Sequence, residues 1–209
     1  MSSTTSTAGL QHPPAGSAPA SVVALLRRVE ENPVIDGPAR ALAALARTVA
    51  PTAGVSDALR GTWLGHALHP LLTDFPLGAW MSASLLDLVG GPEARGPARR
   101  LVGFGLLAAV PTVASGLAEW QDTGGRSRRV GVVHAAVNAT ATTLYLSSWL
   151  ARRRSSHRVA VGLGVAGGLV ATLGGYFGGH LTLVRKIGTT DAAFGTEVSG
   201  VAPTPPKDR

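Results

Sequence analysis

The sequence predicts an all-α fold: a four-helix transmembrane bundle with short loops, preceded by one or two short amphipathic helices. Three observations lead to this prediction. Only 15% of the 209 residues are charged and 45% are hydrophobic, whereas a typical soluble domain has about 25% charged residues. Four apolar segments have the length of about 20 residues that crosses a hydrocarbon core of about 30 Å. Arginine is concentrated in the short connections between these segments, as it is beside lipid headgroups.

The chain before the bundle is expected to contain two short helices. Residues 1–20 are rich in Ser, Thr and Pro, and they predict a disordered tail without a secretory signal. Residues 22–31 and the amphipathic stretch 36–50 predict helices within an N-terminal segment that covers residues 21–58. The second helix has arginines on one side and leucines on the other. This pattern fits both an interfacial helix among the headgroups and a surface helix packed on the bundle.

The apolar segments lie in a transmembrane domain over residues 59–188, and a flexible tail follows over residues 189–209. The segments cover residues 70–89, 101–120, 130–150 and 159–184. Short connections make neighbouring helices antiparallel. Because the segments carry almost no charge, they disfavour a soluble bundle, whose helices need polar outer faces. The arginine count favours both termini in the cytoplasm, for a multi-pass protein of the bacterial inner membrane.

Polar residues from distant parts of the chain fall at one membrane face if the four segments alternate in direction. These residues are His66, His69, Asp74, Glu119, His134 and His180. A polar or charged group in lipid is costly unless it faces the protein interior. We therefore expect one polar stripe on each helix to point inward, so that the stripes together form a His-rich polar pocket near this face.

The helical period of about 100° per residue assigns the members of each stripe. From the first to the fourth segment the stripes are His69, Thr73, Ser84 and Asp87; Thr112, Ser115 and Glu119; His134, Asn138 and Tyr145; and Thr172, Tyr176 and His180. Asp87 lies at the opposite face, where we expect Arg99 or Arg100 to pair with it. Pro70 should place His69 at the N-cap of the first helix. The glycines of the fourth segment suit either close helix packing or the approach of a flat cofactor.

Three functions are compatible with such a pocket. Neutral imidazole ligates haem iron and transition-metal ions. Haem b would need two of His69, His134 and His180, and a metal ion would use these with His66 and with Glu119 or Asp74. Alternatively, the histidines hold the helices together in a structural or accessory membrane subunit. In the third case the same histidines and acids form a proton relay in a small proton-coupled transport component, which would have to form a homo-oligomer.

Several other classes are excluded or unsupported. The chain has no cysteine, which excludes disulfides, thiolate zinc sites and cysteine-ligated iron–sulfur clusters. The net charge of +7 comes from loop arginines rather than from a basic face with interleaved aromatics, so nucleic acid is not an expected partner. There is no nucleophile elbow, phosphate loop or dinucleotide fingerprint, and no enzyme reaction can be assigned.

The segment "LRGTWLGHALHPLLTDFPLGAW", together with the later "FGGHL" around His180, resembles the bacterial membrane family called domain of unknown function 2231. The resemblance covers Leu59 to Gly188. A proline often stands in the family at the place of Ala67. Some relatives carry an appended Rieske-type iron–sulfur domain. The resemblance therefore implies membrane-associated electron transfer, with a Rieske-type or other redox protein as a partner.

Overall fold

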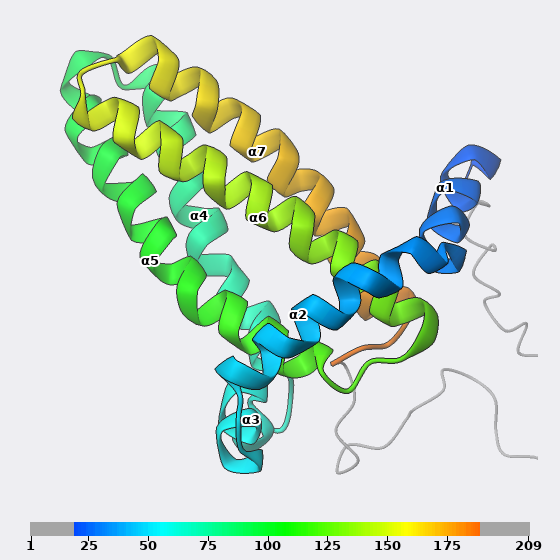
Figure 1. The fold of residues 1–209 in the computed structure, drawn as a ribbon. Coiled ribbons are helices and arrows are strands. Elements are labelled where there is room, and N and C mark those ends of the chain that lie inside the picture. Colours follow the sequence, from blue (N-terminus) through cyan, green and yellow to red (C-terminus); the bar gives the residue numbers. More distant parts are fainter. Residues whose placement is uncertain (1–18, 189–209) are drawn as a thin grey trace, which may run out of the picture.

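The computed structural model describes residues 19–188, and all regular structure in that part of the chain is helical. This confirms the all-α prediction. The predicted tails lie outside the described residues, except for Pro19 and Ala20. Four long helices, each antiparallel to the one before it in the chain, form an elongated bundle (Figure 1). They are α4 (Leu68–Val89), α5 (Arg95–Trp120), α6 (Gly125–Arg153) and α7 (His157–Gly179), which continues into a π-helical turn, η4 (His180–Val184).

The bundle consists of two helical hairpins. We call α4 and α5 the first hairpin, and α6 and α7 the second hairpin, because each of these pairs packs together most extensively. Helix α4 begins at Leu68 with Ala67 as its N-cap. The prediction that His69 is the N-cap is therefore wrong, since Pro70 is accepted within the first turn and His69 is already helical.

Three shorter helices precede the bundle: α1 (Ala20–Glu31), α2 (Asp36–Val49) and α3 (Ala53–Arg60). Helix α2 crosses one end of the bundle and touches both α5 and α6 (Figure 1). Its apolar side buries Ala39, Ala43 and Ala46 against Leu117 and Trp120 of α5. The sequence left open whether this helix lies among the headgroups or packs on the bundle, and in the structure α2 packs on the bundle.

Helix α3 was not predicted, because its short sequence has no long apolar period. Its ends nevertheless carry recognisable signals. The Thr52 hydroxyl accepts a hydrogen bond from the backbone N–H of Val55, which caps the first turn. Gly61 ends the helix with φ of 81°, a left-handed conformation that suits glycine.

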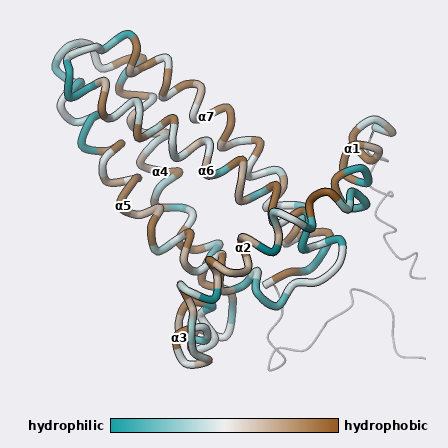
Figure 2. Tube along the Cα trace, in the orientation of Figure 1, coloured by the Kyte–Doolittle hydropathy of each residue, from teal (hydrophilic) through white to brown (hydrophobic). Residues whose placement is uncertain are grey.

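Small side chains fill the bundle, whereas large apolar side chains cover its outside. The buried positions of α7 are occupied mainly by Ala and Gly, including Gly164, Gly167 and Gly174. Exposed large apolar residues include Met81, Leu88, Leu107 and Leu169, all more than 70% exposed. A soluble helix bundle has the opposite arrangement. Small residues at helix contacts and large apolar residues outside are typical of membrane helices. Figure 2 shows hydrophobic residues along most of α7.

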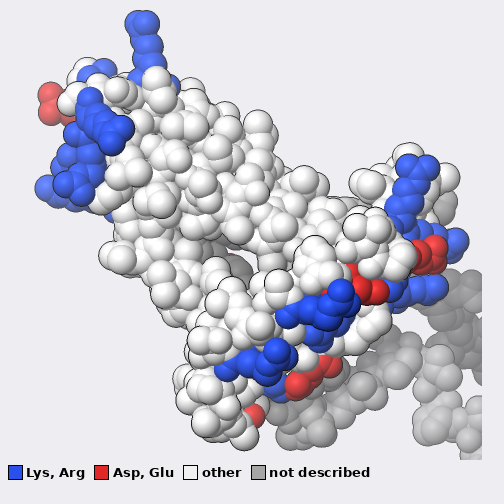
Figure 3. Space-filling model, viewed as in Figure 1, with Lys and Arg blue, Asp and Glu red and all other residues white. Residues whose placement is uncertain are grey.

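On the face shown in Figure 3, charged residues gather at the two ends of the bundle, with an uncharged band between them. Among the described residues, two helical stretches are long and apolar enough to span a membrane: Pro92–Trp120 and His157–Val184. Only 39% and 28% of their apolar windows are buried inside the protein, so neither resembles the core helix of a soluble fold. Two of the four predicted spans are thus supported by length and composition. Spans at α4 and α6 stay predictions.

Candidate functional site

Two of the predicted site residues meet inside the bundle, at the end that α2 crosses. His69 projects from the first turn of α4 and His134 from α6, which lies diagonally opposite. Their ring centroids are 6.2 Å apart and the ring planes are inclined by 82°. We call these two residues the histidine pair.

Each ring of the histidine pair is held by a backbone carbonyl of its own hairpin. His69 Nδ1 lies 2.8 Å from the Thr112 carbonyl oxygen, and His134 Nδ1 lies 2.9 Å from the Gly174 carbonyl oxygen. A carbonyl oxygen only accepts, so Nδ1 is the protonated donor in both rings. This tautomer leaves a lone pair on each Nε2. The Asn138 side-chain nitrogen lies 3.5 Å from His134 Nε2, at the limit of a hydrogen bond.

Glycines of the neighbouring helix make room for both rings. A Cβ on Gly116 of α5 would lie 2.8 Å from the His69 ring, and a Cβ on Gly178 of α7 would lie 3.0 Å from the His134 ring. Both distances are shorter than ordinary carbon contacts of about 3.5–4.0 Å. The rings are therefore fixed by packing as well as by hydrogen bonds.

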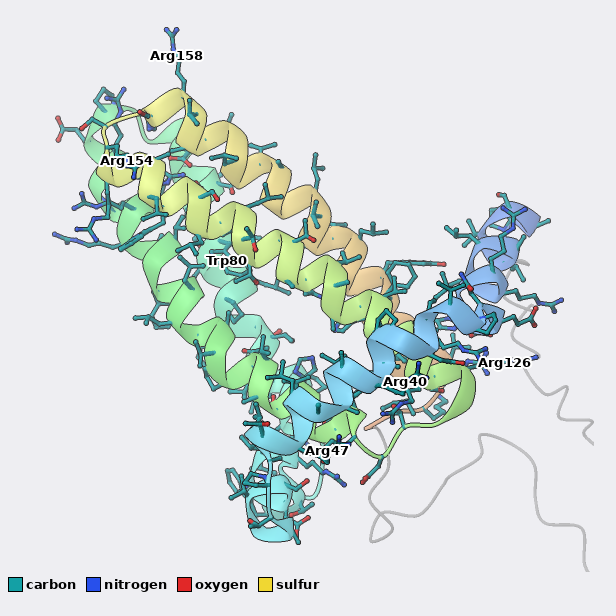
Figure 4. All side chains as sticks on the ribbon, viewed as in Figure 1. Arg40, Arg47, Trp80, Arg126, Arg154 and Arg158 are labelled. Atoms are coloured by element: carbon teal, nitrogen blue, oxygen red, sulfur yellow. The ribbon has the colours of Figure 1, made fainter. Side chains whose placement is uncertain are left out.

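Two further contacts between α4 and α6 continue along the bundle interior. Trp80 and Tyr145 stack with ring centroids 4.1 Å apart, and Figure 4 shows Trp80 between the helices. At the far end Arg152 donates two hydrogen bonds to Asp87, and both side chains are at most 5% exposed. The expected pairing of Asp87 with Arg99 or Arg100 is therefore wrong. Arg152 is one bundle diagonal away and reaches Asp87 through the interior.

His180 belongs to a different cluster, which fastens α1 to the bundle. Its Nε2 lies 2.8 Å from a carboxylate oxygen of Glu30, and Arg185 also donates to this carboxylate. We call these three residues the Glu30 cluster. Burial raises the pKa of the Glu30 carboxyl, but hydrogen bonds and charges from Arg185 and His180 outweigh it and hold the pKa below its usual value.

A second ion pair strengthens the same attachment. Arg129 donates two hydrogen bonds of 2.8 Å to Asp36, and a third of 3.0 Å to the Glu30 carbonyl oxygen. The bidentate Arg129 guanidinium holds the pKa of Asp36 below its usual value, although burial acts in the opposite direction. The start of α2 and the end of α1 are thus both bound to the second hairpin.

His66 and Glu119 line a pocket of about 300 Å³ at the surface of the same end, together with Arg60, Asp122 and Lys186. We call it the surface pocket. His66 is exposed, and Arg60 is paired with Asp122. Glu119 Oε1 is buried and has no hydrogen-bond partner in the described part of the chain. Gly116, which faces His69, lies one helical turn from Glu119.

The six predicted site residues do not form one cluster. Within residues 19–188 no group of three or more His, Asp or Glu side chains is close enough to hold a metal ion. Asp74 is exposed on α4. The predicted stripe of α7 also differs, because Thr172 and Tyr176 are exposed, and the His180 side chain, only 10% exposed, lies against Glu30 of α1.

A family profile described as "Predicted membrane protein (DUF2231)" matches residues 65–191, more than half of the chain. The chain belongs to this family. DUF2231 membership makes the protein a membrane protein, in agreement with its inverted distribution of large and small side chains. No curated protein and no solved structure matches the chain.

The DUF2231 match covers both hairpins and therefore both members of the histidine pair. It begins after α3, so the N-terminal helices that carry Glu30 and Asp36 lie outside it. Sequence reasoning missed Glu30 and Arg152 as interior residues. Both residues stand among other charged residues at the ends of their helices, so the sequence alone does not distinguish them from exposed charges.

Proposed function

We propose that this protein is a multi-pass membrane protein that binds haem through His69 and His134 and takes part in membrane-associated electron transfer. The observation that carries the proposal is the geometry of the histidine pair. Ligating histidines usually donate their second ring nitrogen to a carbonyl or carboxylate, which fixes the tautomer and the ring orientation. Both rings of the pair have this arrangement before any ligand is considered.

The ring separation is also short enough for both residues to hold one metal ion. With metal–nitrogen bonds of about 2.0–2.1 Å, two imidazoles on the same ion would have centroids no more than roughly 6 Å apart. The observed separation is 6.2 Å. Figure 3 shows the surface hollowed beside α2, between α5 and α6, at the end of the bundle that holds the pair.

Haem is favoured over a bare transition-metal ion by the number of ligands. Porphyrin supplies four nitrogens, so haem iron needs only two from the protein. A bare ion needs further protein ligands, and no third His, Asp or Glu joins the pair among residues 19–188. Bound haem would supply one-electron chemistry, and His69 and His134 would hold it.

The membrane arrangement forms part of the proposal. No Asp, Glu, Lys or Arg lies between Arg100 and Glu119, Arg129 and Arg152, or Arg158 and Arg185. The 22 residues of α4 extend about 33 Å at 1.5 Å per residue. We infer that all four long helices cross the bacterial inner membrane. Four crossings put both termini on one side, which the arginine count favours as the cytoplasm.

Full-length protein extracted in detergent provides the test. We expect an absorption spectrum typical of haem with two imidazole ligands, either as purified or after haem is added, and one iron per chain. His69→Ala and His134→Ala should each abolish this spectrum. His66→Ala is the matched control, because His66 lies at the same end but outside the pair, and it should retain the spectrum.

Two results would overturn the haem proposal. One is a folded protein that stays colourless after haem is added. The other is a His66→Ala variant that loses as much haem as the variants of the pair. If the protein instead holds one transition-metal ion per chain and no porphyrin, the ligand of the histidine pair is that ion and not haem. A colourless, metal-free protein would leave the histidines as hydrogen-bonded packing residues of a structural or accessory subunit.

A second candidate function is proton-coupled transport, which the surface pocket favours. The buried Glu119 Oε1 has no partner among the described residues and the pocket beside it is open to the surface. An unpaired carboxyl group at the end of a membrane helix is a typical proton acceptor. Proton uptake into vesicles that contain the protein, lost in Glu119→Gln but not in Asp122→Asn, would support this candidate.

The electron-transfer proposal also requires a redox partner. The chain holds no cysteine for an iron–sulfur cluster of its own. We propose a separate redox protein, such as a Rieske-type protein, docking at the membrane face near the histidine pair. Co-purification with a redox protein that reduces the bound haem would support this, and haem that no membrane fraction reduces would contradict it.

A further inference from the structure

The three contacts between α4 and α6 have the same spacing in the sequence. His69 meets His134, Trp80 meets Tyr145 and Asp87 meets Arg152. In every pair the two residues are 65 positions apart. Any two parallel helices that lie side by side bring together residues with a constant separation in the sequence. The value of 65 therefore shows only that α4 and α6 run in register. A relation between the two hairpins has to be argued from the residues that surround each pair.

Equivalent residues of α4 and α6 contact equivalent residues of α5 and α7. The His69 ring lies against Gly116 and the His134 ring against Gly178, which is 62 positions later. Trp80 lies against Gly105 and Tyr145 against Gly167, again 62 positions later. The carbonyls that accept from the two histidines, at Thr112 and Gly174, have the same spacing.

Many buried positions of the two hairpins correspond under the same spacings. All six buried residues of α7 correspond to buried residues of α5, and three of the six pairs are identical: Ala98 and Ala160, Gly105 and Gly167, and Ala109 and Ala171. In α4 and α6, Pro76, Trp80 and Ala83 correspond to Ala141, Tyr145 and Ser148, all buried. Helical periodicity alone does not reproduce residue types, carbonyl acceptors and glycine contacts together.

We propose that the DUF2231 domain consists of two copies of one helical hairpin related by a pseudo-two-fold axis along the bundle, with His69 and His134 as equivalent ligands on either side of that axis. The part of this inference that concerns the ligand rests on the proposed function. A site on such an axis receives one imidazole from each hairpin, with the same tautomer and the same glycine contact. It suits a ligand that offers two equivalent coordination positions on opposite sides, which is the class of planar metal macrocycles.

The repeat predicts a specific rescue in ligand-free protein. A Cβ on Gly174 would lie 2.5 Å from the Asn138 side chain. Gly174→Thr should therefore lower the equilibrium ratio of folded to unfolded protein roughly tenfold or more. The positions equivalent to Asn138 and Gly174 in the first hairpin hold Thr73 and Thr112. The double variant Asn138→Thr/Gly174→Thr should therefore recover most of this loss, because the first hairpin already has threonine at both equivalent positions.

A displaced pair of substitutions provides the control. Asn138→Thr/Gly167→Thr introduces the same residue types, but the side chain added at position 167 would meet the Tyr145 ring, where a Cβ already lies 3.0 Å away. It should show no recovery relative to Gly167→Thr. Thermal unfolding followed by helical circular dichroism measures all variants. Equal recovery in both double variants, or none in Asn138→Thr/Gly174→Thr, would overturn the repeat.

The equivalence of the two ligands is tested separately on haem-loaded protein. His69→Met and His134→Met should give the same shift in the optical and electron paramagnetic resonance spectra, since each leaves one imidazole and one thioether. Two different spectra would contradict equivalence. If no variant and no wild-type sample binds haem, the proposed function fails, whereas the rescue experiment still decides the repeat.

Discussion

The two hairpins place different residues in the same positions. The first hairpin has a proline inside each helix, Pro76 and Pro111, where the second has Ala141 and Leu173. Trp80 fills the centre from the first hairpin and Tyr145 from the second. In both, a large ring on one helix lies against a glycine on its neighbour. The fold thus depends on the alternation of large and small residues, and less on their chemical identity.

The hairpins differ most where they carry charge. Asp87 in the first corresponds to Arg152 in the second, and Glu119 corresponds to Leu181. Only the second hairpin binds Glu30, through His180 and Arg185. Shared positions therefore build the bundle and the histidine pair, whereas the unshared charged positions determine what else each hairpin contacts.

The largest expected effect removes one charge of the interior ion pair. Asp87→Leu leaves Arg152 buried without its partner, and loss of one member of a buried pair costs about 3–5 kcal/mol of unfolding free energy. Denaturant unfolding in detergent measures this cost. The double variant Asp87→Leu/Arg152→Leu should recover most of it, and a double variant as unstable as Asp87→Leu would refute the explanation.

A smaller effect compares the glycines that face the central rings. Gly105→Ala and Gly167→Ala should each cost about 1–3 kcal/mol, with Gly105→Ala the more harmful, because its Cβ would overlap the Trp80 ring more closely. Gly175→Ala is the control, since a Cβ there meets no atom within 4 Å. It should be neutral or stabilising by up to about 1 kcal/mol. Equal losses at all three glycines would show that ring contact is irrelevant.

Glu119→Leu makes the first hairpin more like the second. The buried Glu119 Oε1 has no partner among the described residues, and an unsatisfied buried group costs about 1–3 kcal/mol. The substitution should therefore stabilise the apo protein modestly in thermal unfolding. If Glu119→Leu destabilises the protein, Glu119 makes a stabilising contact. If the variant loses proton uptake in vesicles, the residue takes part in transport.

The smallest effect is the pH dependence of the Glu30 cluster. The folded-state pKa of Glu30 is below its usual value of about 4.5, so its contribution to stability is complete above this pH. The contribution is lost as the pH falls through the lowered pKa. We expect the hydrogen-exchange protection factors of α1, which correct for the slower intrinsic exchange in acid, to fall below about pH 4.5, and Glu30→Gln to remove this pH dependence. A fall in protection that persists in Glu30→Gln would place the titrating group elsewhere.

Sequence reasoning predicted the long helices well, because their apolar runs and arginine-rich ends are local signals. The inward positions of His69, Ser115 and His134 followed from the helical period alone. The contact between His180 and Glu30 joins residues 150 positions apart, and no local pattern reveals it. The α7 stripe was mispredicted because glycine and alanine, rather than polar residues, define the inward face of that helix.

Helix α2 touches α5 of the first hairpin and α6 of the second, and the Gln121 side chain donates to the carbonyl oxygen of Ala46. Helix α2 therefore connects the two hairpins at one end of the bundle, and the ion pair between Asp87 and Arg152 connects them at the opposite end. Because α2 joins α5 to α6 at the end that holds His69 and His134, its contacts help to keep the two imidazoles at their observed separation. The exposed arginines of this helix, Arg40 and Arg47, face away from the bundle (Figure 4).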